Sequence, residues 1–367
     1  MAEVLIPEVL ILGGYGNFGK RIATALNRHN IPVIIAGRDA HKAETLARTL
    51  PLARGIAVDI TSDLAACLAR EKPSVVVHTC GPFQGADYAV ARTCIAAGVD
   101  YVDLADARDF VRDFSTLDAE AQTAGVTAVS GASTVPGLAS AIVAHFKPQF
   151  ASLDEVDFGI SPGQKAERGL ATTRGILSYA GKRLRPFAGH PDAYGWQDNR
   201  SQTYPVMGRR WFANCDIPDL DLLPPAYGLK SIRFGAGMEL PLLHFGLWGL
   251  SGLVRLGVPL NLPALAEPLL AASNYFNIFG SDTGGLHMHL RGTGLDGKPL
   301  HKTWFIVAAN GDGPQIPCVP AVLLAKRLHE KGPEADLPPG AMACVGLVSL
   351  EDYLKELEPF AVTTFTD

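Results

Sequence analysis

Short apolar runs and helical patterns alternate along the first part of the chain. Residues 9–12 (VLIL) are apolar at every position and are followed by glycine, as expected of a strand buried on both faces of a sheet. From Ile22 to Leu26, apolar residues recur at helical spacing. The same alternation predicts further strands at residues 32–38, 55–60, 74–81, 100–106 and 126–131, with helices at 42–50, 86–97 and 117–124. Such alternation is typical of an α/β fold with a doubly wound, Rossmann-type parallel sheet.

The second half of the chain shows a different pattern. Residues 153–163 alternate apolar and polar side chains, which predicts a half-buried antiparallel strand. Two alternating runs within residues 286–309 are joined through Asp296 and Gly297, a dipeptide typical of hairpin turns. We therefore expect a second, α+β domain with a mostly antiparallel sheet. Residues 186–205, rich in turn formers and aromatics, form either a loop over the site or a plain surface loop.

The glycines after the first predicted strand have the spacing of a dinucleotide-binding turn. Gly14, Gly16 and Gly19 form G-x-G-x-x-G between a strand and a helix. There the first glycine permits a tight turn, the second lets the backbone approach a pyrophosphate, and the third lets the helix pack closely on the strand. Amide groups at the helix start, at Asn17 and Phe18, would face the phosphates. We predict that these five residues bind a dinucleotide.

The end of the second predicted strand bears on the choice of cofactor. An NAD site typically has an acidic residue there, whereas this strand ends at Arg38, whose guanidinium can pair with a 2′-phosphate. The sequence favours NADP(H), with NAD possible because Asp39 could face the ribose; Arg38 could also be a solvated loop arginine. Asp59 is placed either to accept from the adenine amino group or to cap a helix with Thr61 and Ser62.

Composition excludes several classes of protein. The 367 residues suffice for two domains, and 47% hydrophobic with 19% charged residues indicates globular domains with a large core. A net charge of −5 argues against a nucleic-acid partner. Six scattered cysteines form no C-x-x-C pair, which argues against disulfides and zinc and favours a cytoplasmic location. The N-terminus lacks a basic region, so we expect part of a buried strand there rather than a signal peptide.

Five segments together resemble the saccharopine dehydrogenase-like (saccharopine reductase-type) oxidoreductases. They are GGYGNFGKRIA, AGRD, HTCGPF, GVDYVDLAD and SGASTVPGLAS, in this order between residues 13 and 140. The resemblance implies that Cys80, Gly81 and Pro82 lie beside the nicotinamide, with Cys80 a small lining residue.

The resemblance also suggests how the chain divides. We expect a Rossmann NAD(P)-binding domain at residues 1–132 and an α+β substrate and dimerisation domain at 133–310. A C-terminal segment, residues 311–367, would pack back on the Rossmann domain.

Hydride transfer also requires a group that donates or accepts a proton. Tyr88, Asp103 and Asp106 lie near the carboxyl ends of predicted strands, where open α/β sheets bind ligands, and are our catalytic candidates. Asp103 could instead anchor a strand–helix turn, and His78, inside its strand, is expected to be a core histidine. Arg92 stands four positions after Tyr88, so this tyrosine does not form the Tyr-x-x-x-Lys pair of short-chain dehydrogenases.

An apolar stretch from Leu240 to Leu270 is a candidate for contact with a membrane or another subunit. It contains Arg255 and is unsuited to spanning a membrane, so we expect a buried or subunit-interface helix, with weak lipid contact through Leu240–Leu256 as the alternative. His287 and His289 are two residues apart without an identifiable third ligand. We predict no metal site and expect both to face solvent or a subunit interface.

Together these features predict an NADP(H)-dependent oxidoreductase with a small-molecule substrate. The resemblance implies hydride transfer to or from an imine, amino-acid-like or carbonyl substrate. The alternative is a non-catalytic nucleotide-binding protein, a redox sensor or a lipid-associated protein; the apolar stretch and Ala107, where relatives differ, favour it. We expect a homodimer formed through the sheet of the second domain.

Overall fold

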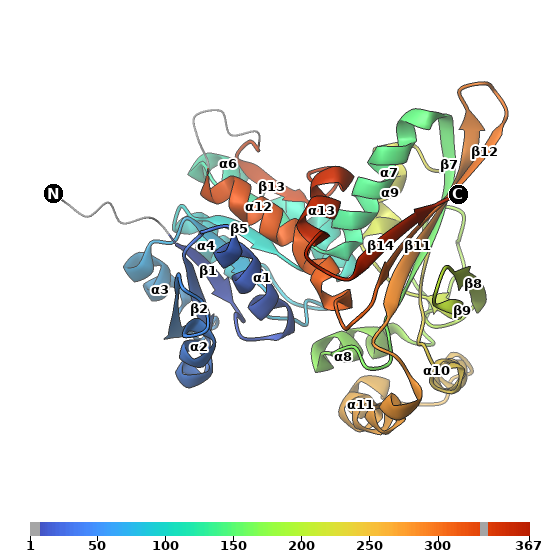
Figure 1. Ribbon diagram of the computed structural model, residues 1–367, viewed down its shortest axis with the longest axis horizontal. Helices are drawn as coiled ribbons and strands as arrows, with labels where there is room; N and C mark the ends of the chain where they lie inside the picture. The colour runs from blue at the N-terminus through green and yellow to red at the C-terminus, as the bar shows by residue number, and fades with distance from the viewer. Residues whose placement is uncertain (1–7, 331–336) are drawn as a thin grey trace. The chain divides into compact units, whose positions relative to one another are not determined.

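The computed structural model describes residues 8–330 and 337–367, which form two compact units (Figure 1). Unit 1 comprises Met1–Leu138 and Gln315–Tyr353, and unit 2 comprises Ala139–Pro314 and Leu354–Asp367. The expected N-terminal strand begins at Val9. Its predicted extension over residues 1–7 lies outside the described residues. The C-terminal part of the chain therefore contributes to both units.

Unit 1 contains a seven-stranded parallel sheet with the order β13-β6-β5-β4-β1-β2-β3. Its strands are β1 (Val9–Leu12), β2 (Val33–Gly37), β3 (Ala53–Ala57), β4 (Val75–His78), β5 (Asp100–Asp103), β6 (Thr127–Ser130) and β13 (Gly340–Ala343). Strand β1 is fully buried. Burial of each of its large apolar side chains stabilises the folded state by about 1.5–3 kcal/mol. Strand order reverses between β1 and β4, which places the topological switch point at their carboxyl ends. The predicted Rossmann-type sheet is confirmed.

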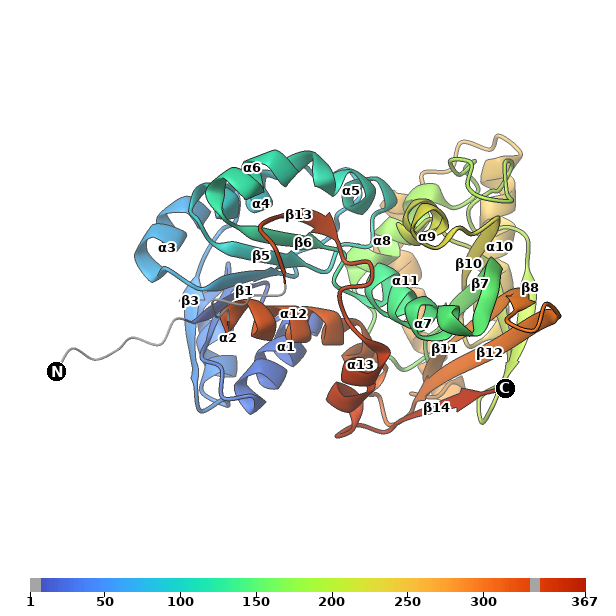
Figure 2. The same ribbon diagram turned by 90° about the horizontal axis from the view of Figure 1, so that it is seen from above.

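Helices cover both faces of this sheet (Figure 2). They are α1 (Asn17–Arg28), α2 (Ala40–Ala47), α3 (Leu64–Glu71), α4 (Ala89–Ala96), α5 (Arg108–Arg112), α6 (Asp118–Ala124) and α12 (Val319–His329). Figure 2 shows α1 and α12 on one face and α4 and α6 on the other. Helix α13 (Leu350–Leu357) crosses the boundary between the units. Helix α12 and strand β13, from the C-terminal part of the chain, thus complete the Rossmann-type unit whose other elements lie within the first 138 residues.

Unit 2 contains the second sheet, with the order β14-β12-β11-β7-β10-β9-β8. Its strands are β7 (Phe150–Ser161), β8 (Arg200–Tyr204), β9 (Gly208–Asn214), β10 (Ser231–Ala236), β11 (Gly284–Gly294), β12 (Pro299–Ala308) and β14 (Val362–Thr366). Strand β7 pairs antiparallel with β11, as predicted, but parallel with β10. Strands β11 and β12 form the predicted hairpin, in which Gly297 takes a positive φ of 78°. The mostly antiparallel second sheet is confirmed.

The two strand histidines differ in their surroundings. His287 is buried, and its Nδ1 lies 2.7 Å from the Tyr204 hydroxyl. The expectation that it faces solvent or an interface is therefore wrong, because its side of β11 packs on aromatic residues of the sheet. His289 is half-buried and contacts Gln202 and His301. Among the described residues, no group of three or more His, Cys, Asp or Glu is arranged to hold a metal.

Unit 2 also contains helices. They are α7 (Ala139–Phe146), α8 (Leu170–Tyr179), α9 (Asp219–Tyr227), α10 (Pro241–Arg255) and α11 (Ala266–Asn274), with short 3₁₀ segments η4 (Leu262–Leu265) and η5 (Tyr275–Phe279). Helices α7 and α9 pack together, and Tyr227 donates a hydrogen bond to the Ser140 carbonyl at 3.2 Å. None of the helices in the described ranges is long and apolar enough to cross a membrane.

Of the loop predicted at residues 186–205, the part from Arg200 to Tyr204 forms strand β8, whereas residues 186–199 form a loop that holds the inner side of α10. Trp196 is buried and donates to the His244 carbonyl at 3.3 Å, while Gln197 donates to Ser251 Oγ at 2.5 Å. Its buried residues do not fit a plain surface loop. The outer side of α10 is exposed, so a helix buried within the chain is excluded, and the subunit-interface alternative stays a prediction.

Candidate nucleotide-binding and active site

The glycine turn after β1 is tight because neighbouring backbone or side-chain atoms occupy the space of each missing side chain. The left-handed conformation, with φ of 75°, belongs to Gly13, the residue immediately before the motif. A Cβ on Gly14 would lie 2.9 Å from the Ile35 side chain. A Cβ on Gly19 would lie 2.3 Å from the Gly13 carbonyl oxygen, so α1 can approach the turn only with glycine there.

The start of α1 suits a phosphate group. Gly16 is its N-cap and is exposed, no side chain caps it, and the first turn of this fully described helix carries no acid. A Cβ on Gly16 would meet the Gly13 carbonyl oxygen at 3.0 Å, whereas its outward side is open. Helix N-termini with free amide groups bind anions. The residues present therefore fit the pyrophosphate of a dinucleotide.

Two more predicted residues flank this helix start. The Asn17 side chain accepts a hydrogen bond from Arg21 one turn later, and the Phe18 carbonyl accepts from the Cys318 thiol at 3.7 Å. Cys318 immediately precedes α12, so the C-terminal segment of unit 1 contacts the nucleotide turn.

Arg38 and Asp39 at the end of β2 take different roles. Asp39 is the N-cap of α2 and accepts from the Lys42 amide at 3.1 Å, so its carboxylate is engaged within the helix. Arg38 is exposed and lies near enough to Asp59 and Cys80 to influence both electrostatically. This arrangement leaves the guanidinium available at the carboxyl edge of the sheet, as 2′-phosphate binding requires.

Asp59 occupies a tight turn of its own. Its Oδ1 accepts from the Thr61 amide at 2.9 Å and from the Thr61 hydroxyl at 2.7 Å, and these bonds lower the pKa of the carboxyl. The N-cap of α3 is Asp63, so the predicted capping by Asp59 is wrong. Its adenine contact stays a prediction.

The loop after β4 carries the residues expected beside the nicotinamide. Gly81 and Pro82 are exposed, and Cys80 is half-buried. Burial raises the pKa of the Cys80 thiol to about 11, so the thiol is protonated near neutral pH. A protonated thiol is a poor nucleophile. The geometry therefore agrees with a lining role for Cys80.

Asp103 lies at the centre of a buried polar network. Its Oδ1 accepts from the Ser130 hydroxyl at 2.9 Å and from the amides of Ala105 and Gly131 at 3.0 and 2.8 Å. Burial raises the pKa of this carboxyl to about 6. The side chain is wholly inaccessible, so it joins β5 to β6 rather than contacting a substrate.

His78 and Tyr88 are also held by internal contacts. His78 is a buried histidine, as predicted: its Nδ1 lies 2.9 Å from the Tyr101 hydroxyl, and burial lowers its pKa to about 4. Tyr88 donates its hydroxyl hydrogen to the Phe110 carbonyl at 2.9 Å and packs on Phe110. Neither group is placed as a free proton donor.

Asp106 differs from the other candidate acids. It is half-buried in the loop after β5, and Gln84 donates to its Oδ1 at 3.2 Å. Gln84 belongs to the loop after β4, four residues beyond Cys80, so two neighbouring loops meet at this carboxyl. Desolvation raises the pKa of Asp106. A carboxyl group with a raised pKa at the edge of a cofactor site is suited to proton transfer.

Two residues of this edge were missed by the sequence analysis. The Tyr15 ring fills the space that a Cβ on Gly37 would take, and its hydroxyl accepts from the Asp39 amide at 3.1 Å. Gln84 orients Asp106. Tyr15 lies inside the glycine motif, and this position could have marked it as a site residue. The sequence around Gln84 contains no comparable indication.

The comparisons with known proteins agree with this geometry. Residues 9–129 match the family model of the saccharopine dehydrogenase NADP-binding domain. The apo histidine-tagged saccharopine dehydrogenase (L-Glu forming) from Saccharomyces cerevisiae is similar in fold, with a TM-score of 0.69 and 15% identity, over 98% of this chain and 100% of that one. An amine dehydrogenase from Mycobacterium smegmatis matches with a TM-score of 0.49 and 15% identity, over 94% of this chain and 96% of that one. No curated protein sequence matches the chain.

The family model and the nucleotide turn together confirm the predictions of NADP as the cofactor and of an NAD(P)-dependent dehydrogenase or reductase. Residues 9–129 carry the NADP-binding domain of the saccharopine dehydrogenase family, and the chain as a whole is similar in fold to a saccharopine dehydrogenase.

Proposed function

We propose that the chain reduces or forms a C=N or C=O bond of an amino-acid-like or carbonyl substrate, with Asp106 exchanging the proton. The observation that carries this proposal is the Asp106 carboxyl, held by Gln84 where the loops after β4 and β5 meet. The name of the matched family supports an imine over a simple ketone.

Each group of the chain has a separate task in this reaction. When bound, NADPH would supply the hydride for the carbon of the C=N or C=O bond, and the electron pair of that bond would be left on the nitrogen or oxygen. The start of α1 and Arg38 bind the phosphates, and the loop of Cys80 to Pro82 lines the nicotinamide side. Asp106 gives its proton to the nitrogen or oxygen, and takes it back in the reverse direction. Its raised pKa keeps a larger protonated fraction than an exposed carboxyl has.

The experiment compares Asp106→Asn with Asp109→Asn, an exposed acid on the next helix, in NADPH consumption with keto acids plus amines and with carbonyl compounds. We expect Asp106→Asn to lower kcat/KM roughly 10²–10⁴-fold without changing NADPH affinity, because one proton-transfer group is lost. Reductive activity of the parent protein should fall as pH rises through the pKa of Asp106, and this limb should vanish in Asp106→Asn. Equal activity of the two variants would remove Asp106 from the proposal, and consumption with carbonyl compounds alone would remove the imine.

A further inference from the structure

The segment between Leu240 and Gly280 has an unusual exposed surface. The exposed positions of α10 are Pro241, Leu242, Phe245, Gly246, Trp248, Gly249, Leu253 and Arg255. All but the last are apolar or glycine. A helix whose outer side faces water normally carries charged and polar residues there. The outer side of α10 is therefore suited to contact with something other than water.

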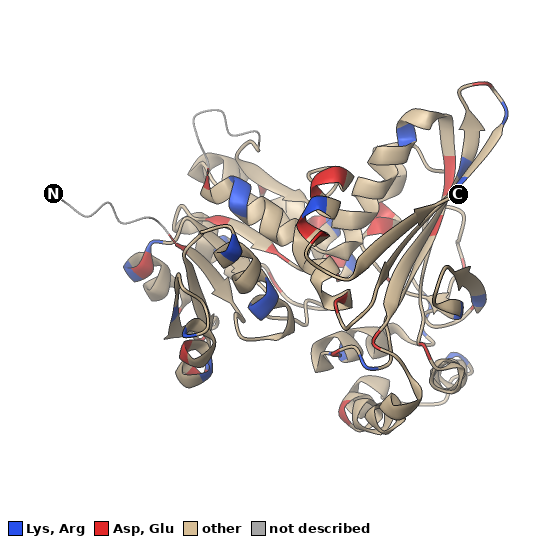
Figure 3. Ribbon diagram, in the orientation of Figure 1, with Lys and Arg blue, Asp and Glu red and all other residues tan. Residues whose placement is uncertain are grey.

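Exposed apolar side chains continue beyond the helix. Leu256 is 83% exposed just after α10, and Tyr275, Ile278 and Phe279 in η5 are 82%, 78% and 70% exposed. Between Leu240 and Gly280 the residues with full charges are Arg255 and Glu267. Figure 3 accordingly shows α10 and α11 mostly tan. Patches of this kind mark interaction surfaces.

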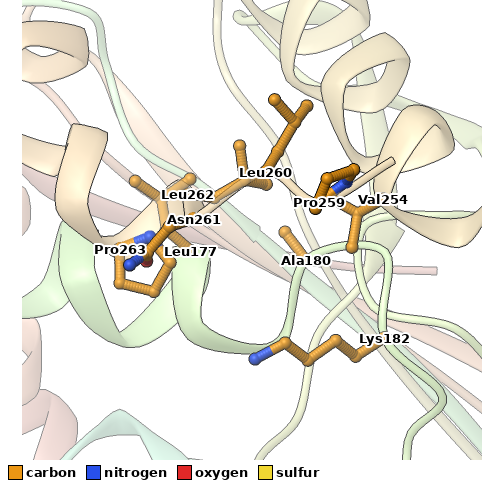
Figure 4. Close-up of a pocket in the computed structure, with 9 residues that line it drawn as sticks. All are labelled: Leu177, Ala180, Lys182, Val254, Pro259, Leu260, Asn261, Leu262 and Pro263. Carbon is orange, nitrogen blue, oxygen red and sulfur yellow. The ribbon is translucent and has the colours of Figure 1, made fainter. Parts of the chain in front are cut away.

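Cations border the carboxyl end of this helix. Lys182 lines a pocket of about 310 Å³ together with Val254 of α10 and Pro259 (Figure 4). The Arg255 guanidinium lies 4.2 Å from the centroid of the Tyr194 ring, and Tyr194 bridges to Arg183 through the backbone. We call Lys182, Arg183 and Arg255 the basic rim. Asp192 pairs with Arg183 and leaves the rim with a net positive charge.

We propose that the outer side of α10 and the basic rim bind the surface of a membrane that contains anionic lipids. The aliphatic and aromatic side chains enter the acyl boundary, and the rim contacts lipid phosphates. A second copy of this chain would present the same cations and would not complement the rim. With 15 residues, α10 is about 22 Å long, too short for the roughly 30 Å hydrocarbon core, and so lies along the surface. The inference is independent of the proposed reaction.

The test is flotation of the full chain with vesicles of phosphatidylcholine plus phosphatidylglycerol, and with phosphatidylcholine alone. The parent protein should float with the anionic vesicles and bind the neutral ones less. Of the four tryptophans, Trp196 and Trp304 are buried and Trp211 is half-buried, whereas Trp248 is 42% exposed. A blue shift of fluorescence on binding would therefore report on α10.

Two variant pairs separate the apolar surface from the rim. We expect Leu242→Gln with Leu253→Gln to reduce the bound fraction at least about tenfold, because both leucines leave the acyl boundary. Leu295→Gln, an exposed leucine in the β11–β12 turn, should bind normally. Lys182→Glu should weaken binding to anionic vesicles because the basic rim loses a cation. Lys298→Glu, in the β11–β12 turn, is the control and should not weaken it. Thermal melting checks that each variant is folded.

Three outcomes would overturn the proposal. The parent protein could remain unbound with both kinds of vesicle. The Leu242→Gln, Leu253→Gln pair could float as well as the parent does. Sedimentation velocity could show self-association that this pair abolishes, which would assign the surface to a second copy of the chain.

Discussion

Ser281 donates two hydrogen bonds to Glu239, from its hydroxyl to Oε1 at 2.7 Å and from its amide to Oε2 at 2.9 Å. Glu239 immediately precedes the segment that contains α10, η4, α11 and η5, and Ser281 immediately follows it. The two ends of this apolar segment are therefore held together at one carboxylate. The backbone amide of Gln164 also donates a hydrogen bond to Glu239 Oε2 at 2.6 Å, and Arg210 forms an ion pair with Oε1 at 3.2 Å.

Replacing Glu239 tests this connection. Glu239→Gln should lower the free energy of unfolding by about 2–4 kcal/mol, since Arg210 and Glu239 are both about nine-tenths buried and the arginine would lose its counter-charge. Limited proteolysis should cleave between residues 240 and 280 more quickly in the variant. Lys298→Ala, which breaks an exposed pair with Asp296, should change neither measurement. Unchanged proteolysis in Glu239→Gln would show that the segment is held elsewhere.

Arg38 is predicted to select the cofactor. Arg38→Ala should weaken NADPH binding roughly 10–100-fold and leave NADH binding nearly unchanged. The reason is that the guanidinium forms charged hydrogen bonds with the 2′-phosphate, which NADH lacks. Fluorescence titration with each nucleotide measures both affinities. Arg48→Ala is the matched control, since Arg48 is an exposed arginine of the same region that pairs with Glu44. Parallel losses for NADPH and NADH would place Arg38 at another part of the cofactor.

Two buried groups of unit 1 should give opposite pH dependences of stability. The pKa of His78 is lowered by burial to about 4, so its contribution is complete above its unfolded value of 6.5 and is lost as pH falls. The pKa of Asp103 is raised by burial to about 6, so its contribution is complete below its unfolded value of 3.8 and is lost as pH rises. Each effect amounts to roughly 3 kcal/mol.

Substitutions should separate the two contributions. Between about pH 4 and 6, stability of His78→Gln should fall with rising pH more steeply than that of the parent. Stability of Asp103→Asn should rise more steeply over this range, and the asparagine oxygen can keep the acceptor role at Ser130 and Gly131. Urea unfolding at several pH values measures these slopes, with His41→Gln, an exposed histidine, as control. Curves that run parallel to the parent's would contradict the assignment.

Local patterns in the sequence determined which segments form the main strands of the two sheets and in what order these strands follow along the chain. Residues 9–12 are apolar throughout because β1 is covered on both faces, and the Asp296–Gly297 turn makes a hairpin without help from distant residues. The glycine motif likewise reports backbone constraints within a few residues of itself. Arg38 could be predicted as the residue for the 2′-phosphate because its position directly after β2 follows from the same local pattern of strands and turns.

Tertiary structure alone decided which residues meet. The strand Gly340–Ala343 has little apolar signal and pairs with β6 through backbone groups. Gln84 meets Asp106 only because β4 and β5 are neighbours in the sheet, and His287 is buried only because β8 and β9 bring aromatic rings to it. The sequence of α10 is apolar on both sides, so its composition could not show which side Trp196 covers and which stays exposed. Burial depends on contacts between distant segments, whereas the sequence pattern records only the neighbours along the chain.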